Sequence, residues 1–338
     1  MLDAAALVLA FYTYLLGYQL YGSSNLTVLT IDNTIIQAVT TIAVISYVLS
    51  TLWQNIKHTK RIGTIKLSLL VCIITATTIL STANLIYLRR HSEPHHYIHD
   101  HPLQIELALQ FLLEGKNPYT ENYQETPLPK WSSWPTNPAV YHFISLPSAL
   151  YLALPVFVAW KSLFGWFDHR IVNILFFAIA SASACTLLRK QEHRVLAILA
   201  FGMNPLFTPH FIMGLDDIVF LGTILLSLAL LSKKKVSLSL ITLAIAVTTK
   251  HTAWFIVPFY FYHLHQKGLP WKKTAKLCLA FACTSATLLL PFIVWNARAF
   301  FEDIYSYPAG TIPTGYPVQG FGIVPLLVSK GIINAQLT

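Results

Sequence analysis

The chain has 338 residues, of which 55% are hydrophobic and only 11% are charged. A soluble protein carries about 25% charged residues, so the composition excludes a water-soluble fold and predicts a multi-span membrane protein. The net charge is +9, but the basic residues lie in short clusters between apolar runs, which indicates membrane topology and not nucleic-acid binding.

Apolar stretches long enough to form membrane spans recur along the whole chain. A span needs about 20 mostly apolar residues. The candidates are Ala4–Tyr21, Ile35–Trp53, Leu67–Leu88, Ile171–Leu188, Val195–Met213, Ile218–Leu231, Val236–Thr249, Trp254–His263 and Leu277–Trp295, and a further span begins near Gly320. We therefore expect an all-α, polytopic transmembrane bundle of about 9–10 spans that forms one membrane domain over residues 1–338.

Four basic clusters give the expected orientation. They are Lys57/Lys60/Arg61/Lys66, Arg189/Lys190/Arg194, Lys233/Lys234/Lys235 and Lys267/Lys272/Lys273/Lys276. All four fall on one side of the membrane if the apolar segment Pro147–Phe167 does not cross, and basic turns are typically cytoplasmic. We therefore place that segment at the outer interface, the N-terminus in the cytoplasm, and a large loop of residues 89–168 outside the cell membrane.

The outer loop contains the first candidate catalytic residue, Asp100. Pro102 suits the first turn of a helix, Leu103–Leu113 has the pattern of an amphipathic helix, and Gly115 ends it. At the mouth of the bundle, Asp100 can act as a general base that takes the proton of an acceptor hydroxyl. The alternative is a plain helix N-cap.

Asp216 and Asp217 open a span directly after Gly214. Carboxylates at a helix N-terminus are favoured by the helix dipole, so capping is one explanation. Capping one helix requires only one acidic residue, whereas two adjacent acids lie here at the edge of the hydrocarbon region. Acidic residues at the membrane boundary indicate a functional role. We expect both to lie at the substrate-binding site.

Basic residues on the outer face are candidates for holding the phosphate of a lipid-linked donor. They are Lys250, which is followed by His251, together with Arg298, Arg89 and Arg90. The alternative for Lys250 is a side chain at the end of a span that extends to the membrane interface. Arg89 and Arg90 are expected on the outer side, although basic residues are typically cytoplasmic. Binding a phosphate would explain their position.

Five histidines crowd the start of the outer loop: His91, His95, His96, His99 and His101. Histidine and carboxylate ligands suit zinc or manganese, and His99 and His101 are the weak metal candidates. Pro94 and Pro102 argue against one continuous helix that would make these side chains converge, so we expect no metal cofactor. Tyr119, which follows the amphipathic helix, is either an interfacial aromatic or a residue that stacks on a sugar.

Several short motifs follow one another in a distinctive order, beginning with the outer-loop acid and the helix that ends in Gly115-Lys116-Asn117-Pro118-Tyr119. The later motifs are Asn204-Pro205, Gly214-Leu215-Asp216-Asp217, Thr249-Lys250-His251, Pro258-Phe259, Pro291-Phe292, Trp295-Asn296 and Tyr316-Pro317-Val318-Gln319-Gly320-Phe321-Gly322. Over roughly residues 89–325 the chain resembles the GT-C superfamily of integral-membrane glycosyltransferases. It looks most like bacterial members of glycosyltransferase family 87, the polyprenol-phosphate-mannose-dependent mannosyltransferases.

The resemblance implies an inverting transfer of a sugar, mannose, from a polyprenyl-phosphate donor to a glycan or lipid-linked acceptor on the outer face. It implies Asp100 as the base, Asp216 and Asp217 near the site, and Lys250 beside the donor phosphate. The shared module would cover residues 61–338, with residues 1–60 as an added hairpin. The chain ends at Thr338, inside an expected further span. Family members are usually longer, so the resemblance predicts a fragment or a short form.

Two other functions fit parts of the pattern. A transporter or flippase for a lipid-linked or metal substrate also uses acids and histidines near spans. Such a carrier needs polar or broken helices at mid-membrane, whereas here the polar residues gather at the outer ends of apolar spans. A structural partner in an envelope complex needs no chemistry, and the acids Asp216 and Asp217 argue against it. The expected partners are therefore the lipid bilayer, a donor and an acceptor, with no nucleic acid.

Overall fold

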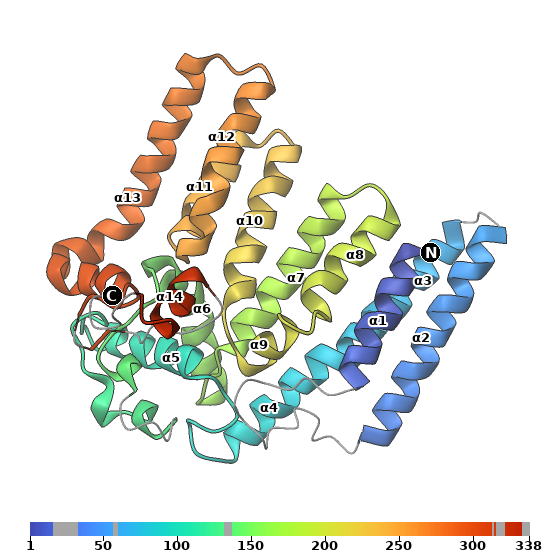
Figure 1. Cartoon of the computed structure of the whole chain (residues 1–338), viewed down its shortest axis with the longest axis horizontal. Helices are drawn as coiled ribbons and strands as arrows, with labels where there is room; N and C mark the ends of the chain where they lie inside the picture. Colours follow the sequence, from blue (N-terminus) through green and yellow to red (C-terminus); the bar gives the residue numbers. More distant parts are fainter. Residues whose placement is uncertain (16–32, 57–59, 132–136, 313, 316–321, 333–338) are drawn as a thin grey trace. The chain divides into compact units, whose positions relative to one another are not determined.

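The computed structural model describes residues 1–15, 33–56, 60–131, 137–312, 314–315 and 322–332, which contain helices and no strand (Figure 1). Five helices are long and apolar enough to cross a membrane, and three shorter helices are also apolar. The prediction of an all-α, polytopic helix bundle is confirmed, and the chain is a membrane protein.

The chain folds into two compact units, each with most of its contacts within itself. Unit 1 contains Met1–His99 and Asp168–Leu243, and unit 2 contains Asp100–Phe167 and Ala244–Thr338. Each unit is therefore built from two separate stretches of the chain, and the expected single membrane domain stays a prediction.

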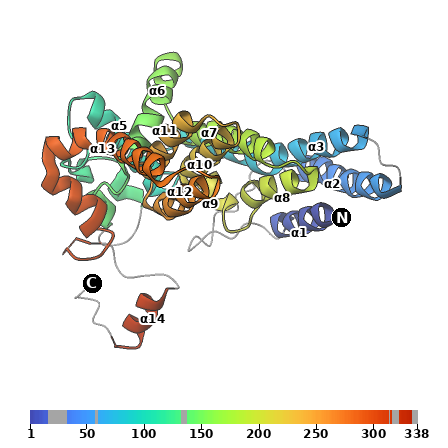
Figure 2. The same ribbon diagram turned by 90° about the horizontal axis from the view of Figure 1, so that it is seen from above.

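Unit 1 is made of helices, most of which follow the predicted spans. They are α1 (Leu2–Leu15), α2 (Asn33–Ile56), α3 (Lys60–Ile74), the π-helical turn η1 (Thr75–Ile79), α4 (Leu80–Arg90), α7 (Arg170–Leu187), α8 (Gln191–Gly202), α9 (Thr208–Met213), α10 (Asp217–Ser232) and the start of α11 (Val236–Val247). Helices α7 and α10 lie side by side (Figures 1 and 2). A Cβ atom at Gly222 would lie 2.8 Å from the Phe176 carbonyl oxygen, so a glycine is needed for this close approach.

The expected span Val195–Met213 is broken in the structure. Helix α8 ends at Gly202 and α9 begins at Thr208. Pro205 disfavours a helical conformation of Asn204, whose side chain accepts a hydrogen bond from the Leu206 N–H group at 2.8 Å. Length and hydropathy alone do not detect this break, because the residues on both sides of it are apolar.

The first helix is tied to unit 1 by a buried ion pair. Asp3 of α1 accepts hydrogen bonds from Lys66 Nζ of α3 at 2.5 Å and from Tyr47 Oη of α2 at 2.7 Å. All three side chains are buried. The described part of the added N-terminal hairpin is therefore joined to the remainder of its unit by charges as well as by apolar packing.

Unit 2 combines short helices of the outer loop with the C-terminal hairpin. Its elements are α5 (Asp100–Leu113), η2 (Tyr123–Glu125), η3 (Leu128–Trp131), η4 (Pro138–Val140), α6 (Pro147–Phe164), the end of α11, η5 (His251–Phe255), α12 (Ile256–Gln266), α13 (Trp271–Phe301), η6 (Glu302–Ser306) and α14 (Ile323–Ser329). The predicted helix after Asp100 is present, but all residues from Pro102 to Leu109 are buried, so it is a core helix with an exposed C-terminal end and not a one-sided surface helix.

Helix α6 is the segment that the charge pattern places at the outer interface. It is continuous despite Pro155, and it is long and apolar enough to cross a membrane. Within unit 2 it runs across the direction of α12 and α13 and not alongside them (Figures 1 and 2). This direction agrees with an interfacial helix, which stays a prediction.

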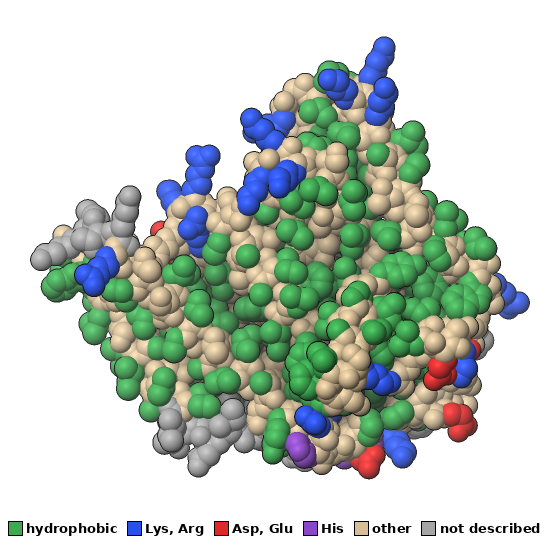
Figure 3. All heavy atoms as spheres, turned by 180° about the vertical axis from the view of Figure 1, so that it is seen from behind, with side chains coloured by type: hydrophobic (Ala, Val, Ile, Leu, Met, Phe, Trp, Pro, Cys, Tyr) green, Lys and Arg blue, Asp and Glu red, His purple; other side chains and the backbone are tan. Residues whose placement is uncertain are grey.

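The charged side chains of the C-terminal hairpin lie at its two ends. Lys267, Lys272 and Lys273 are exposed around the turn between α12 and α13 (Figure 3). Glu302 and Asp303 follow the far end of α13. This separation within one hairpin is the pattern expected when the basic turn is cytoplasmic and the acidic end faces outside.

Candidate active site

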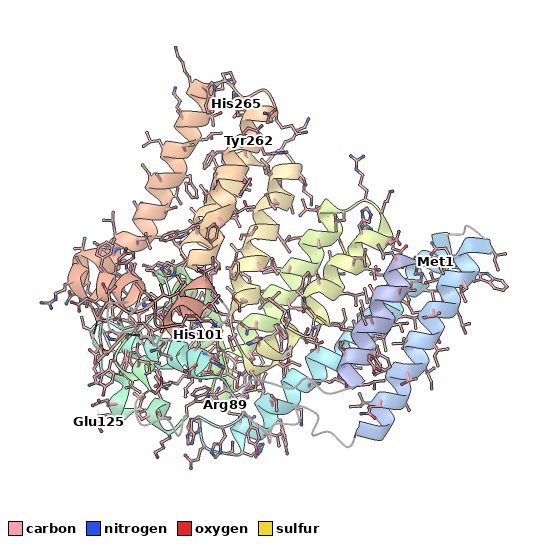
Figure 4. The ribbon with its side chains drawn as sticks, viewed as in Figure 1. Met1, Arg89, His101, Glu125, Tyr262 and His265 are labelled. Carbon is pink, nitrogen blue, oxygen red and sulfur yellow. The ribbon has the colours of Figure 1, made fainter. Side chains whose placement is uncertain are left out.

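Three charged side chains meet in unit 1, where α4 ends and α7 begins. Asp168 accepts hydrogen bonds from Arg89 Nη1 at 2.9 Å and from Arg170 Nη2 at 2.7 Å. Burial opposes ionisation of Asp168, but the two guanidinium groups outweigh it and hold the pKa of this carboxyl well below its ordinary value. Arg89, labelled in Figure 4, also donates to the Pro94 carbonyl at 2.8 Å, whereas the neighbouring Arg90 is exposed.

Arg170 also fixes the beginning of the outer loop. Its Nη1 atom donates to the Tyr97 carbonyl at 2.8 Å. Two residues later, the His99 N–H group donates to the Met213 carbonyl at 2.9 Å. The segment between Arg89 and His99 is thus held at Tyr97 by α7 and at His99 by the end of α9.

The Asp216-Asp217 turn is held by the same end of α7. Asn173 Nδ2 donates to the carbonyls of Gly214 and Leu215, each at 2.9 Å. Gly214 has a φ angle of +100°, which glycine adopts without strain. Asp216 is 2% exposed, and Asp217 begins α10. Unit 1 therefore gathers Arg89, Asp216 and Asp217 at one end of the α7–α10 pair.

The sequence analysis did not single out Asp168, His169 and Arg170. These three residues are all buried. They lie in the sequence where α6 is followed by α7, which begins at Arg170. The rule that marks boundary acids as functional applies to Asp168 as well as to Asp216. That rule, applied to every boundary, would have identified the ion cluster.

Asp100 is the first residue of α5, in unit 2, and its side chain is partly buried. One helical turn later, Gln104 Nε2 donates to the carbonyls of Ala139 and His142, each at 2.6 Å. Residues four apart on a helix share a face, with an axial rise of about 6 Å. The face of α5 that presents Asp100 is therefore packed against the segment that contains His142.

His142 joins this segment to the turn after α13. Its Nδ1 atom lies 2.7 Å from Asp303 Oδ1, and Asp303 Oδ2 accepts the Phe143 N–H group at 2.8 Å. The Asp303 side chain is only 4% exposed. The sequence analysis singled out neither His142 nor Asp303, because these two residues meet only in the folded chain.

The Lys250-His251 turn lies against the same region of unit 2. Thr248 and Ser148 share a hydrogen bond of 2.7 Å between their hydroxyl groups, which joins the end of α11 to α6. His251 hydrogen-bonds the backbone of Ile304, and burial, with a smaller contribution from Lys250, lowers its pKa. The segments that contain Asp100, His142, Asp303 and Lys250 thus form one connected polar network.

Arg298 lies in the last turn of α13. Asn296 interrupts α13 with a φ of −160°, and its side chain accepts the Ala299 N–H group at 3.0 Å, which restarts the helix. Arg298 Nε donates to Glu302 at 2.8 Å, while the arginine side chain is 87% exposed. This guanidinium is the most accessible of the predicted cations that we describe in unit 2.

Tyr119 lies in the core of unit 2. It is 3% exposed, and its ring packs edge-on against Phe143, Phe292 and Phe300. Its hydroxyl donates to the Ser145 carbonyl at 2.7 Å, and burial raises its pKa well above the ordinary value. A ring enclosed in this way has no free face for a sugar, so the stacking alternative finds no support.

The histidines of the outer loop contact one another and the backbone. His91 Nδ1 lies 2.8 Å from the Tyr87 carbonyl, and the His95 and His96 rings are 4.4 Å apart. Among the described residues, no three His, Cys, Asp or Glu side chains are grouped to hold a metal ion. His99 and His101 belong to different units, and Figure 4 shows His101 on α5.

Some predicted features lie outside the described residues. They are Lys57 of the first basic cluster, the end of the first span, and the Tyr316–Phe321 part of the last motif.

Residues 110–266 match the family model described as alpha-(1->6)-mannopyranosyltransferase, N-terminal domain. The matched range includes His142, Asp168, Asp216 and Lys250, and Asp100 lies outside it. The chain is a membrane glycosyltransferase, and the match, over slightly less than half of its residues, supports mannosyl transfer. The match agrees with a GT-C mannosyltransferase and is compatible with glycosyltransferase family 87, an assignment that stays a prediction. No curated protein and no solved structure matches the chain.

For a mannosyltransferase, the two units offer different chemistry. Unit 2 contains a partly buried carboxylate at Asp100 and cations at Lys250 and Arg298, all outside the apolar helix centres. In unit 1, Arg89 is committed to Asp168, so a donor phosphate would have to share its guanidinium with a buried carboxylate. Unit 2 therefore offers the clearer candidates for a base and for a cation that could bind an anion.

Proposed function

We propose that the enzyme transfers mannose from a polyprenyl-phosphate donor to a hydroxyl of a glycan or lipid-linked acceptor, on the outer face of the cell membrane. The observation that carries the proposal is the polar network of unit 2. It joins the Asp100 helix to the Lys250 turn through His142, Asp303 and His251. A carboxylate and a cation in one network suit a reaction that removes a proton at one end and releases a phosphate at the other.

The proposed step is a single displacement. The Asp100 carboxylate takes the proton of the acceptor hydroxyl, and the hydroxyl oxygen attacks the anomeric carbon on the side opposite the phosphate. The bond between this carbon and the phosphate oxygen breaks, and its electron pair leaves with the polyprenyl phosphate. One such displacement inverts the anomeric configuration. The leaving group departs as an anion, so Lys250 stabilises it without donating a proton.

The orientation follows from charge. Within each unit the basic turns lie at the opposite ends of helices from the candidate site residues, as Lys233–Lys235 follow α10 and Asp217 begins it. Placing the basic turns in the cytoplasm puts the site on the outer face and the N-terminus inside.

Labelled donors test the proposed function directly. Membranes that contain the protein are incubated with polyprenyl-phosphate [³H]mannose or GDP-[³H]mannose, with octyl α-mannoside as acceptor. We expect label to move only from the lipid-linked donor. Transfer from GDP-mannose under conditions that prevent formation of the lipid-linked sugar would refute the donor class. A parallel incubation with polyprenyl-phosphate [³H]glucose tests the sugar, and transfer of glucose but not of mannose would refute mannose as the transferred sugar.

The substitution Lys250→Ala tests the phosphate contact. Removing a charge-assisted contact to the donor should raise the apparent KM for polyprenyl-phosphate mannose roughly ten-fold or more. Lys250→Arg keeps the charge and should have a smaller effect. Lys267→Ala, in the exposed turn between α12 and α13, is the matched control. A wild-type donor KM in Lys250→Ala would show that Lys250 does not contact the donor phosphate.

A further inference from the structure

Besides Asp100 and Lys250, unit 2 contains a third polar group that neither the sequence motifs nor the proposed step uses. The His142 ring is held on both of its nitrogen atoms. Nδ1 lies 2.7 Å from Asp303 Oδ1, and Nε2 lies 2.6 Å from Thr314 Oγ1. An imidazole oriented by a carboxylate on one nitrogen, with a hydroxyl on the other, is the arrangement that enzymes use to bind and activate hydroxyl groups.

The orientation of the ring is fixed by its surroundings. The Tyr307 ring, 2% exposed, stacks on it at a centroid distance of 4.7 Å. Gln104 fixes the His142 carbonyl at 2.6 Å, and Asp303 also accepts the Phe143 N–H group at 2.8 Å. These contacts should hold the His142 ring in its orientation without the contact to Thr314.

The two sides of the ring differ in access to solvent. Asp303 is buried, with 4% of its side chain exposed, whereas the His142 side chain is 11% exposed and Thr314 is exposed. The Nε2 atom therefore points toward the surface, at a hydroxyl on an exposed segment.

The position in the network connects this group to the proposed reaction. Gln104, which fixes His142, lies one turn of α5 after Asp100, an axial rise of about 6 Å. A sugar acceptor has several hydroxyl groups, of which one reacts and the others are available for binding. His142 is thus close to the end of α5 at which the proposed base lies.

We propose that His142, oriented by Asp303, binds a hydroxyl group of the sugar acceptor, and that Thr314 Oγ1 occupies the position of this hydroxyl in the structure. The inference rests on the proposed function, because it assumes that the acceptor is a sugar. It adds an acceptor-binding residue to a site for which the sequence indicated only a base and phosphate-binding cations.

Two amide substitutions separate the two nitrogens of the ring. In His142→Asn the amide lies near the former Nδ1 position, so the bond to Asp303 is kept and the Nε2 contact is lost. In His142→Gln the amide reaches the former Nε2 position. We expect the apparent KM for octyl α-mannoside to rise roughly ten-fold in His142→Asn, with the donor KM unchanged, and to stay near the wild-type value in His142→Gln. A structural role through Asp303 predicts the reverse order.

Thr314→Val removes only the hydroxyl group that occupies Nε2. Because the acceptor would no longer have to displace it, we expect the acceptor KM to fall, roughly two- to five-fold. Thr314→Ser keeps a hydroxyl and is the matched control. An acceptor KM that rises in Thr314→Val would show that Thr314 supports the ring, and it would overturn the inference.

Direct binding separates the inference from the proposed function. Saturation-transfer NMR measures binding of octyl α-mannoside to the purified protein without any donor. Binding that is lost in His142→Asn and kept in His142→Gln supports the acceptor site even if no mannose is transferred. Normal transfer with wild-type acceptor KM in both variants overturns the acceptor site and leaves the proposed function intact. A wild-type protein that neither binds nor mannosylates this probe overturns both.

Discussion

Replacing Asp100 by asparagine is expected to lower sugar transfer by roughly 10²- to 10⁴-fold, the usual contribution of a general base. The amide cannot take a proton from the acceptor hydroxyl. Asparagine is as good a helix N-cap as aspartate, so the start of α5 should be preserved. Initial rates with labelled polyprenyl-phosphate mannose, normalised to the amount of protein in the membrane, measure the effect.

The same substitution distinguishes the two roles that the sequence left open for Asp100. If Asp100 only caps α5, Asp100→Asn should transfer sugar at the wild-type rate. Glu114→Gln, an exposed carboxylate just after α5, is the control for a general loss of negative charge, and we expect it to be active. An active Asp100→Asn enzyme would exclude Asp100 as the base.

The largest effect on stability is expected at Asp168. Asp168→Ala leaves the guanidinium groups of Arg89 and Arg170 buried without their carboxylate. Breaking a buried ion pair in this way costs about 3–5 kcal/mol. The thermal midpoint of the detergent-solubilised protein should fall sharply, whereas Glu114→Gln, which affects only the exposed pair with Lys116, should leave it nearly unchanged. A wild-type midpoint in Asp168→Ala would contradict the structural role of the cluster.

The pH dependence of this effect has a definite sign. The pKa of Asp168 is lower in the folded protein than its ordinary value of 3.8. A group of this kind contributes stability above its unfolded pKa and loses it only as the pH falls through the folded pKa. The difference in thermal midpoint between the wild type and Asp168→Ala should therefore stay constant from about pH 8 to about pH 5. A difference that disappears within this range would mean that Asp168 is not held ionised.

The sequence was sufficient to identify the class of protein and the kind of chemistry. Span length and hydropathy are properties of a continuous stretch of chain, so α2, α7 and α10 follow the predicted spans closely. The family match likewise agrees with the resemblance to mannosyltransferases. The break between α8 and α9 was missed, because one Asn-Pro pair interrupts a stretch that remains apolar.

The candidate site was predictable only in part. Asp100, Asp216 and Lys250 stand out because each is a charged residue at the edge of an apolar run. Tyr119 has the same sequence setting as an interfacial aromatic, yet its ring is enclosed by Phe143, Phe292 and Phe300, which come from two distant stretches of the chain. This enclosure depends on tertiary packing, so the sequence around Tyr119 does not reveal it.

The sequence by itself determined that this is an all-helical membrane protein whose candidate site residues lie at the ends of its apolar runs, because hydropathy and charge are read along the chain. Only the tertiary structure decided which charges are partners. Arg89 meets Asp168 across 79 positions, and His142 meets Asp303 across 161. No periodicity or motif links residues so far apart, since their meeting depends on how the helices pack. That packing buried Arg89 in an ion cluster and left His142 oriented toward the surface.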